Sequence, residues 1–314
     1  MLLFRILSLF IFSLIAAPAA HAASSSPNLA GYYDTFMALC DGNAYAWTGA
    51  ERPRMIRESV RQVGVGRTNR YALATSGELL YFRDQSSEPK SLQKNVHSFY
   101  AGRSGLLMIK GDQSLWHIPA SSFLGFGEKI EGIASKIADG VRTASVGDSA
   151  NYFVTTSGEL FVKGLAHRGQ YGDGLLTETD RFVKTAENVS QIVAHTGHAI
   201  LLKRDGGVWG TGGNIYGPVG KHGLGDKATR WSLITENAIA VATGASHSLA
   251  IKGDKSLWIW GRNETIEPKA IFDDVEAVAA GNDTNIALSG GYLWQWDTGS
   301  RPEKKMKCRT ASVN

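Results

Sequence analysis

Short segments in which every second residue is apolar recur along the chain, separated by glycine-rich turns. In the segment that begins at Gly147, the apolar residues Tyr152 and Val154 stand five and seven positions after the glycine. Apolar residues occupy the same two offsets after six further positions: Gly31, Gly66, Gly102, His195, Gly244 and Gly281. A period of two predicts a β-strand with one face buried. We call the seven starting residues the anchors, and each defines one repeat unit.

Each predicted strand leads through a turn into a second apolar strand, which is the signal of a β-hairpin. The turn is "TSGE" at 75–78 in the second unit and "KGDK" at 252–255 in the sixth. A further strand precedes each anchor, as Val141 and Ala144 do six and three positions before Gly147. No segment has the period of a long amphipathic helix. Each unit is therefore expected to form an antiparallel sheet of three or four strands.

The two faces of such small sheets become covered when the sheets stack radially around a channel. The expected fold is all-β, a seven-bladed β-propeller formed by residues 29–314. An open β-solenoid is the alternative, although its repeats are usually shorter than the 35 to 49 residues between anchors. The "RTASV" at 142–146 recurs at 309–313, so the C-terminal strand is expected to complete the first blade and close the ring. The stretch "SSSPNLA" before the first anchor is predicted to be a poor strand.

The two cysteines, Cys40 and Cys308, lie near opposite ends of the predicted propeller. Cys308 stands six residues before Asn314, which matches an anchor, and Cys40 stands nine residues after Gly31. If the closing strand pairs with the first strand of the first blade, these positions place the two cysteines opposite each other. A disulfide between them is expected, because an exported chain reaches an oxidising compartment. Two free buried thiols are the alternative.

The segment "MLLFRILSLFIFSLIAAPAAHAA" combines Arg5, an apolar core and an A-x-A site at Ala20–Ala22. Residues 1–22 are expected to be a removed signal peptide, followed by a linker at 23–28, so the protein is expected to be periplasmic or secreted. A retained N-terminal anchor is the alternative. The core is shorter than the roughly 20 residues of a membrane span, and no membrane span is expected elsewhere.

The composition and the motifs of the sequence limit the kinds of partner and of reaction that can be expected. With 43% apolar and 20% charged residues the chain is not of the disordered class. A net charge of +4 without a long basic run gives no sign of a nucleic-acid partner. The sequence lacks the G-x-S-x-G, P-loop, H-E-x-x-H and dinucleotide-binding motifs, so no catalytic residue and no cofactor are expected. Four carboxylates in loop motifs are interpreted as turn residues: Asp173, Asp226, Asp273 and Asp274.

His195 and His198 are the most metal-like pair in the sequence. A spacing of three on a strand or tight turn does not direct both rings toward one ion, and no third ligand is evident in the sequence. No metal site is therefore expected.

The segment "VATGASHSLAIKGDKSLWIWGRN", Val241–Asn263, resembles the regulator of chromosome condensation repeat family. "HRGQYGDG" at 167–174 and "GNIYGPVGKHGLGD" at 213–226 are similar to the loop that follows the strands in that family. The resemblance extends over residues 31–314, is clearest in units four to six, and implies a seven-bladed propeller with C-terminal closure. It also implies a structural role for His198 and His247, which share one repeat position.

The family includes nuclear exchange factors for a small GTPase and exported bacterial inhibitors of β-lactamases. The predicted signal peptide favours an exported member, similar in architecture to the inhibitor propellers. The expected function is non-enzymatic binding of an unidentified protein or peptide by a monomer, through loops around the central channel. A polysaccharide-active enzyme or a carbohydrate-binding propeller is the alternative.

The candidate binding residues follow the anchors and are expected to converge around the channel. They are Tyr32, Tyr33, Asp34, Arg67, Asn69, Arg103, Asp148, His195, His198, Ser246, His247, Asn282 and Asp283. Five tryptophans at second-strand positions are expected to pack between blades: Trp209, Trp258, Trp260, Trp294 and Trp296. Five aromatic residues fall outside the predicted strands and either bind a partner or cover loop bases: Tyr32, Tyr33, Tyr171, Tyr216 and Trp231.

Overall fold

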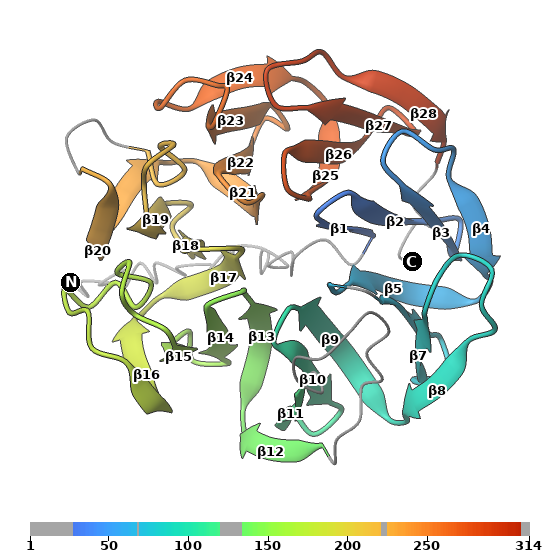
Figure 1. The fold of residues 1–314 in the computed structure, drawn as a ribbon, viewed down its shortest axis with the longest axis horizontal. Helices are drawn as coiled ribbons and strands as arrows, with labels where there is room; N and C mark the ends of the chain where they lie inside the picture. Colours follow the sequence, from blue (N-terminus) through green and yellow to red (C-terminus); the bar gives the residue numbers. More distant parts are fainter. Residues whose placement is uncertain (1–27, 68, 120–133, 221–224, 309–314) are drawn as a thin grey trace, which may run out of the picture.

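The computed structural model describes residues 28–67, 69–119, 134–220 and 225–308. These residues form seven four-stranded antiparallel sheets, which are arranged as blades around a central channel (Figure 1). Within each blade the strands follow sequence order from the channel to the rim. No helix occurs in the described part of the chain. The prediction of an all-β, seven-bladed propeller is confirmed.

The strands of the first four blades are β1 (Leu29–Tyr32), β2 (Thr35–Cys40), β3 (Asn43–Thr48), β4 (Arg54–Arg57), β5 (Val60–Val65), β6 (Arg70–Ala74), β7 (Leu79–Phe82), β8 (Lys90–Gln93), β9 (Val96–Gly102), β10 (Gly105–Lys110), β11 (Leu115–Pro119), β12 (Ser135–Ala138), β13 (Val141–Val146), β14 (Ala150–Thr155), β15 (Leu160–Gly164) and β16 (Thr179–Ala186). Those of the last three blades are β17 (Val189–Ala194), β18 (His198–Lys203), β19 (Val208–Gly213), β20 (Lys227–Thr235), β21 (Ala238–Thr243), β22 (His247–Lys252), β23 (Leu257–Gly261), β24 (Lys269–Phe272), β25 (Val275–Ala280), β26 (Thr284–Ser289), β27 (Tyr292–Asp297) and β28 (Glu303–Lys307).

The N-terminal segment was expected to be a signal peptide with a short linker. Residues 1–22 and most of the linker at 23–28 lie outside the described residues. The signal peptide therefore stays a prediction. Across the described ranges, no helix has the length and apolar character that a membrane crossing requires.

The hydrophobic core consists of seven clusters, one between each pair of neighbouring blades. In β6, Tyr71 and Leu73 pack toward the third blade, while Ala72 between them packs toward the first. The inner strands are thus buried on both faces, whereas the sequence pattern predicted one buried face. The reason is that each blade lies between two others, so alternate side chains serve two different interfaces. Each large apolar side chain buried in this way contributes about 1.5–3 kcal/mol.

Six of the seven anchors are glycines, and at several of them neighbouring blades approach closely beside the channel. A Cβ at Gly102 would lie 2.5 Å from the carbonyl oxygen of Val146 in the next blade. A Cβ at Gly147 would lie 2.9 Å from the carbonyl oxygen of His195, again in the next blade. At Gly281 it would overlap the carbonyl oxygen of Tyr33, where the seventh blade meets the first. The recurring glycine therefore reflects backbone packing between blades.

Replacing Gly281 with alanine is expected to destabilise the protein by about 1–3 kcal/mol, the usual cost of overpacking. The added methyl group must displace the Tyr33 carbonyl, which accepts a hydrogen bond from the Asn282 N–H at 2.8 Å. Urea unfolding measures the change. The matched control is Gly111→Ala, since a Cβ at Gly111 meets no atom within 4 Å. Equal stability of the two variants would show that the seventh and first blades tolerate separation at this point.

Further contacts close the ring between the seventh blade and the first. A hydrophobic cluster shared by the two blades includes Phe36, Trp47 and Leu288. The Trp47 indole donates a hydrogen bond to Gln295 Oε1 at 2.8 Å. A disulfide joins Cys40 and Cys308, whose Cα atoms lie 5.0 Å apart, and this confirms the predicted pairing.

Cys308 occupies the position that begins the innermost strand in other blades. Its N–H donates to the Gly291 carbonyl at 2.9 Å, as the Val60 N–H donates to the Gly42 carbonyl at 2.8 Å. The predicted offset of six residues before an anchor is therefore correct for Cys308. Residues 309–314, which were expected to continue as the closing strand, lie outside the described residues.

The innermost strand of the first blade is β1, and here the prediction from the sequence is wrong. Leu29 of the "SSSPNLA" stretch pairs with Ala38 in β2. The two-residue turn Tyr33–Asp34 sets this register, and Tyr33 adopts a positive φ of 53° there. Leu29 is buried in the cluster between the seventh and first blades. Pairing and burial thus form a strand where local sequence preference is weak.

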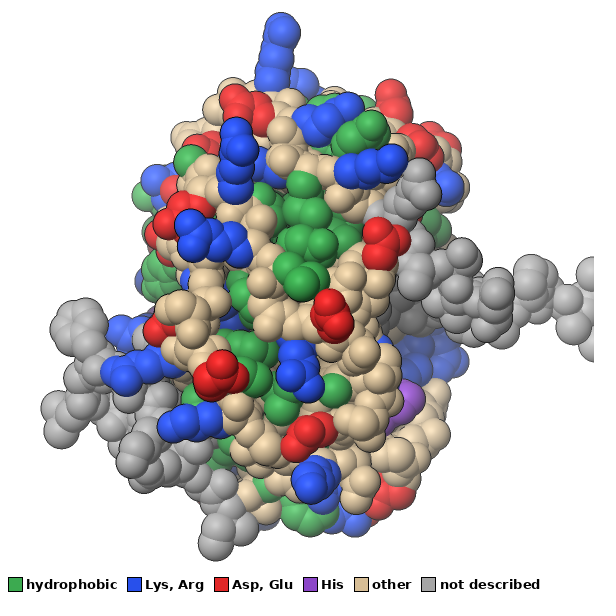
Figure 2. All heavy atoms as spheres, turned by 90° about the vertical axis from the view of Figure 1, so that its right-hand side faces the viewer, with side chains coloured by type: hydrophobic (Ala, Val, Ile, Leu, Met, Phe, Trp, Pro, Cys, Tyr) green, Lys and Arg blue, Asp and Glu red, His purple; other side chains and the backbone are tan. Residues whose placement is uncertain are grey.

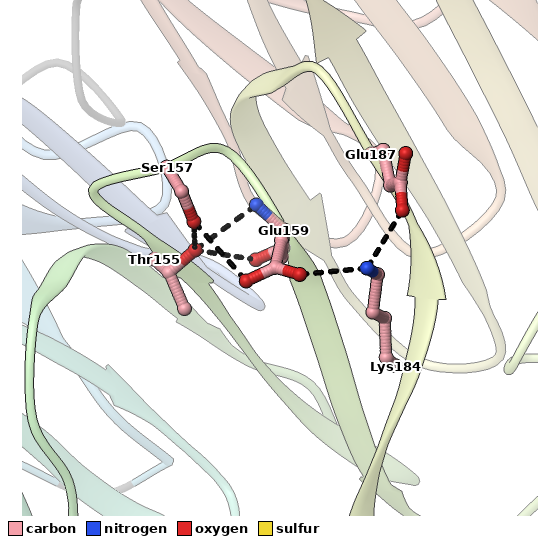
Figure 3. Close-up of polar contacts among 5 residues, drawn as sticks. All are labelled: Thr155, Ser157, Glu159, Lys184 and Glu187. Carbon is pink, nitrogen blue, oxygen red and sulfur yellow. Dashed lines mark hydrogen bonds and ion pairs between the residues drawn. The ribbon is translucent and has the colours of Figure 1, made fainter.

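The hairpin turns lie at the end of the blades opposite the anchors, and many are held by side-chain contacts. Figure 3 shows the turn between β14 and β15, where the Ser157 hydroxyl donates to Glu159 Oε2 at 3.1 Å. Lys184 bridges Glu159 and Glu187, at 2.6 Å from each carboxylate. These groups are solvent-accessible, so the network fixes turn geometry more than it adds stability.

The side of the propeller drawn in Figure 2 carries no surface of a single charge. On the side shown in Figure 2, basic and acidic side chains are interspersed, with hydrophobic side chains between them. This side therefore offers no extended basic track of the kind that nucleic-acid-binding proteins carry.

Candidate partner-binding face

The anchor loops share one end of the propeller with the longest loops. In an antiparallel four-stranded blade, the connection from first to second strand and that from third to fourth strand emerge at the same end. The loops at 165–178 and 214–226 are of the second kind and follow β15 and β19. We call this end the anchor-loop face. It brings together most of the candidate binding residues.

Tyr32 reaches across the mouth of the channel to the opposite side of the ring. Its hydroxyl donates a hydrogen bond to Asp148 Oδ1 at 2.5 Å, although 116 residues separate the two. Its ring stacks on His195 with a centroid distance of 5.3 Å. Burial raises the pKa of Tyr32 well above its usual range, and the hydrogen bond to Asp148 raises it further. The neutral phenol therefore links the first, fourth and fifth blades over the channel.

His198 and His247 lie inside the protein, between blades. They are 3% and 0% exposed. His198 Nε2 contacts Ser248 Oγ at 3.2 Å, and His247 Nε2 contacts Asn285 Oδ1 at 2.7 Å. Burial lowers the pKa of His198 to about 3 and that of His247 to about 4, so both are neutral at pH 7. These contacts agree with the structural role that the repeat resemblance implied, and both residues are almost completely buried.

The other candidates differ in accessibility. Asn69 is buried, as are Tyr32 and His195 at the channel mouth. Asp283 is half-buried and forms an ion pair with Arg262 at 3.4 Å. Four candidates are exposed: Tyr33, Asp34, Arg67 and Arg103. Four are half-buried: Asp148, Ser246, Asn282 and Asp283.

A pocket of about 470 Å³ opens on the anchor-loop face beside the fifth and sixth blades. Among the predicted residues, its wall contains Tyr33, His198, Ser246 and Asn282. The structure thus brings four of the candidates to one cavity.

The pocket also contains residues that sequence reasoning missed as binding candidates. They are His167, Arg168, Ile215, Asp226 and Lys227, together with Tyr216, which was one of the loop aromatics. All except Lys227, which directly follows the second motif, belong to the two glycine-rich loop motifs at 167–174 and 213–226. These motifs were interpreted as marks of the repeat. One sequence feature could have indicated this pocket: Ile215 and Tyr216 are two adjacent large apolar residues in a glycine-rich loop that lacks strand periodicity.

The tryptophans lie mostly between blades, as predicted. Trp260 and Trp296 are buried in inter-blade clusters, and Trp209 and Trp294 pack against such clusters. Trp258 differs, since it is half-buried beneath the Lys252 ammonium group at 5.1 Å.

The five aromatic residues that were assigned to loops differ in their position and exposure. Tyr32 and Trp231 lie in β1 and β20, so placing them outside the strands was wrong. Their strands form through pairing with β2 and β19, which the local pattern does not encode. Tyr171 is 1% exposed and donates to the Gly164 carbonyl at 2.7 Å, so it covers the base of its loop. Tyr216, 54% exposed, remains a candidate for binding.

The described residues contain no group of three or more His, Cys, Asp or Glu side chains that could hold a metal ion. Of the carboxylates interpreted as turn residues, Asp173 accepts a hydrogen bond from the Leu175 N–H at 2.8 Å within its own loop. This contact is typical of a turn residue.

Comparisons with known proteins agree with this architecture. Residues 238–264 match the regulator of chromosome condensation (RCC1) repeat. A mouse protein, the secretion-regulating guanine nucleotide exchange factor, is 30% identical over 128 residues. This alignment spans 38% of the present chain and only 28% of the mouse protein.

Solved structures of low sequence identity share the fold. Prp20p from Saccharomyces cerevisiae has a TM-score of 0.68 and 16% identity, covering 83% of this chain and 82% of Prp20p. A chain of the crystal structure of Kap60 bound to yeast RCC1 (Prp20) has a TM-score of 0.72 and 14% identity, covering 99% and 92%. Human WBSCR16 has a TM-score of 0.69 and 15% identity, covering 83% and 86%. The chain is a seven-bladed β-propeller that carries the regulator of chromosome condensation repeat.

Proposed function

We propose that this chain is an exported, non-enzymatic propeller that binds a protein or peptide partner on its anchor-loop face. The observation that carries the proposal is the pocket beside the fifth and sixth blades. Exposed Tyr33, Ile215 and Tyr216 lie around a cavity that also offers the polar groups of Ser246 and Asn282. Large exposed aromatic side chains beside polar groups are typical of recognition surfaces.

Two further considerations support the proposal. The N-terminal sequence has the pattern of a signal peptide, which would direct the chain out of the cytoplasm. Propellers of the same fold include Prp20p, which was studied for its binding to Gsp1p and histones, and yeast RCC1 bound to Kap60. Exported members of the family that inhibit β-lactamases provide the nearest expectation for a partner class, and β-lactamase inhibition is directly testable.

Replacing Tyr33 and Arg103 together with alanine is expected to weaken capture of the partner at least tenfold and to shift the melting temperature little. Both side chains are exposed, and surface changes of this kind usually cost no more than about 0.5 kcal/mol. The measurement is a quantitative pull-down from the exported fraction of the source organism. The control pair is Met55→Ala with Arg57→Ala, which are exposed on the outer strand β4.

Undiminished capture by the Tyr33 and Arg103 variant would place the binding surface on the rim or the opposite end. Treating the extract with a protease separates the two partner classes. Loss of the captured ligand supports a protein partner, whereas its survival supports the carbohydrate-binding alternative.

A further inference from the structure

The pocket beside the fifth and sixth blades holds two cations without an acidic partner. Arg168 belongs to the loop after β15, and Lys227 begins β20. Among the described residues, no carboxylate lies within ion-pair distance of either side chain. The neighbouring Arg262 is different, because it pairs with Asp283 at 3.4 Å and lies over the Tyr216 ring at 5.5 Å.

Glycines allow the Arg168 side chain to lie beside the strand position of Lys227. Lys227 pairs with Gly213 across the β19–β20 ladder. A Cβ at Gly213 would lie 3.4 Å from Arg168 Cδ, and a Cβ at Gly197 would lie 3.1 Å from a terminal guanidinium nitrogen of Arg168. The Arg168 side chain therefore rests on two glycine backbones, directly beside the strand position that carries Lys227. The Arg168 backbone is fixed as well, since its N–H donates to Gln170 Oε1 at 2.8 Å.

The formal charge of the pocket selects the type of anion. Arg168 and Lys227 contribute two positive charges and Asp226 one negative charge, which leaves one positive charge. One carboxylate neutralises this sum, whereas a phosphate dianion would exceed it. The planar guanidinium and the ammonium group both form charge-assisted hydrogen bonds with a carboxylate.

Two exposed apolar side chains, Ile215 and Tyr216, form an apolar ledge beside the two cations. Ile215 is 69% exposed, Tyr216 is 54% exposed, and both line the same cavity. Exposed side chains of this size gain most when a partner covers them. The site therefore combines a cationic wall with an apolar ledge, and both lie within reach of one short chain segment.

We propose that this pocket takes an Asp or Glu carboxylate of an extended partner segment, between Arg168 and Lys227, while an apolar neighbour in that segment covers Ile215 and Tyr216. This inference rests on the proposed function and specifies the chemistry of the partner. A nucleic acid is disfavoured, because the chain has a net charge of only +4 and no long basic run.

The test uses the whole protein and a defined probe. Random dodecapeptides displayed on phage are selected on the immobilised propeller, and the best binder is synthesised with a fluorescent label. A second peptide carries Gln or Asn in place of each Glu or Asp. Fluorescence anisotropy compares both peptides on the wild type, on Arg168→Gln with Lys227→Gln, and on the control Arg54→Gln with Lys90→Gln. The control residues are exposed on β4 and β8, and their replacement changes the net charge equally.

We expect selected peptides to be enriched in Asp or Glu beside a large apolar residue. Neutralising the peptide or the two pocket cations should each weaken binding at least tenfold, and combining both changes should weaken it little further. The Arg54 and Lys90 variant should bind within twofold of the wild type. Melting temperatures establish that the variants are folded.

Three results would overturn the inference: no enrichment of acidic residues, equal binding of the neutralised peptide, or an equal loss in the control variant. In each case, peptides that still lose affinity when Tyr33 and Arg103 are replaced would leave the proposed function intact. If the wild type retains no peptide, both the inference and the proposed function fail. Displacement of the peptide by an equal concentration of random single-stranded DNA would favour a nucleic-acid ligand and would also overturn the inference.

Discussion

Replacing Cys40 and Cys308 with alanine is expected to lower the free energy of unfolding by roughly 5 kcal/mol at most. The disulfide joins residues 268 positions apart, so it removes a large amount of conformational freedom from the unfolded chain. It also crosses the interface where the ring closes, between the cluster residues of the seventh and first blades. For a domain of this size the expected fall in melting temperature is roughly 10 °C.

Calorimetry of the oxidised protein and of the double variant measures this effect. Wild-type protein that has been reduced in denaturant and refolded with blocked thiols is the second measurement, and it should melt close to the variant. Both sulfur atoms belong to buried residues, so reductant added to the native protein should act slowly. A variant that melts at the temperature of the oxidised wild type would show that the non-covalent contacts alone close the ring.

Acidification from pH 7 to pH 5 is expected to destabilise the protein by about 2 kcal/mol for each of His198 and His247. Burial lowers the pKa of both imidazoles in the folded state, to about 3 and about 4. In the unfolded chain a histidine titrates near pH 6.5, so at pH 5 the unfolded state binds protons that the folded state does not. Stability is therefore complete above about pH 6.5 and is lost as the pH falls toward the folded-state pKa values.

Urea unfolding at intervals between pH 7.5 and pH 5 measures this slope. His247→Gln should reduce the slope by about one proton, because it removes one of the buried imidazoles. His195 adds to the effect with the same sign, because burial lowers its pKa also. A wild-type protein of equal stability at pH 7 and pH 5 would mean that the buried imidazoles gain solvent or a carboxylate before the protein unfolds.

The sequence pattern predicted those features that repeat. The apolar alternation located the second strand of every blade, and the anchor spacing located the blades themselves. The position of Cys308 followed from its offset, because the same offset carries a valine or alanine in the other units. Each copy of the pattern is independent support for the same local structure, and for this reason repetition makes prediction robust.

Features that do not repeat were harder to predict. β1 forms through pairing with β2 and burial of Leu29, neither of which the local sequence encodes. The contact between Tyr32 and Asp148 crosses the channel and joins the first and fourth blades. The pocket collects side chains from loops of several blades, including Arg168 and Lys227. These arrangements depend on which loop ends face each other in the closed ring, and a period along the sequence carries no information about that.

The position of Cys308 after the seventh blade also sets an order of events during biosynthesis. Cys40 belongs to the second strand of the whole propeller, whereas Cys308 follows the last strand described. Cys40 must therefore remain reduced, or pair outside the chain, while the rest of the first blade and the six following blades are translated. Oxidation can join the correct partners only after the ring has been assembled far enough to bring them together. The native disulfide is accordingly a late marker of maturation, and the thiol of Cys40 is the group at which a thiol-oxidising enzyme would first meet the nascent protein.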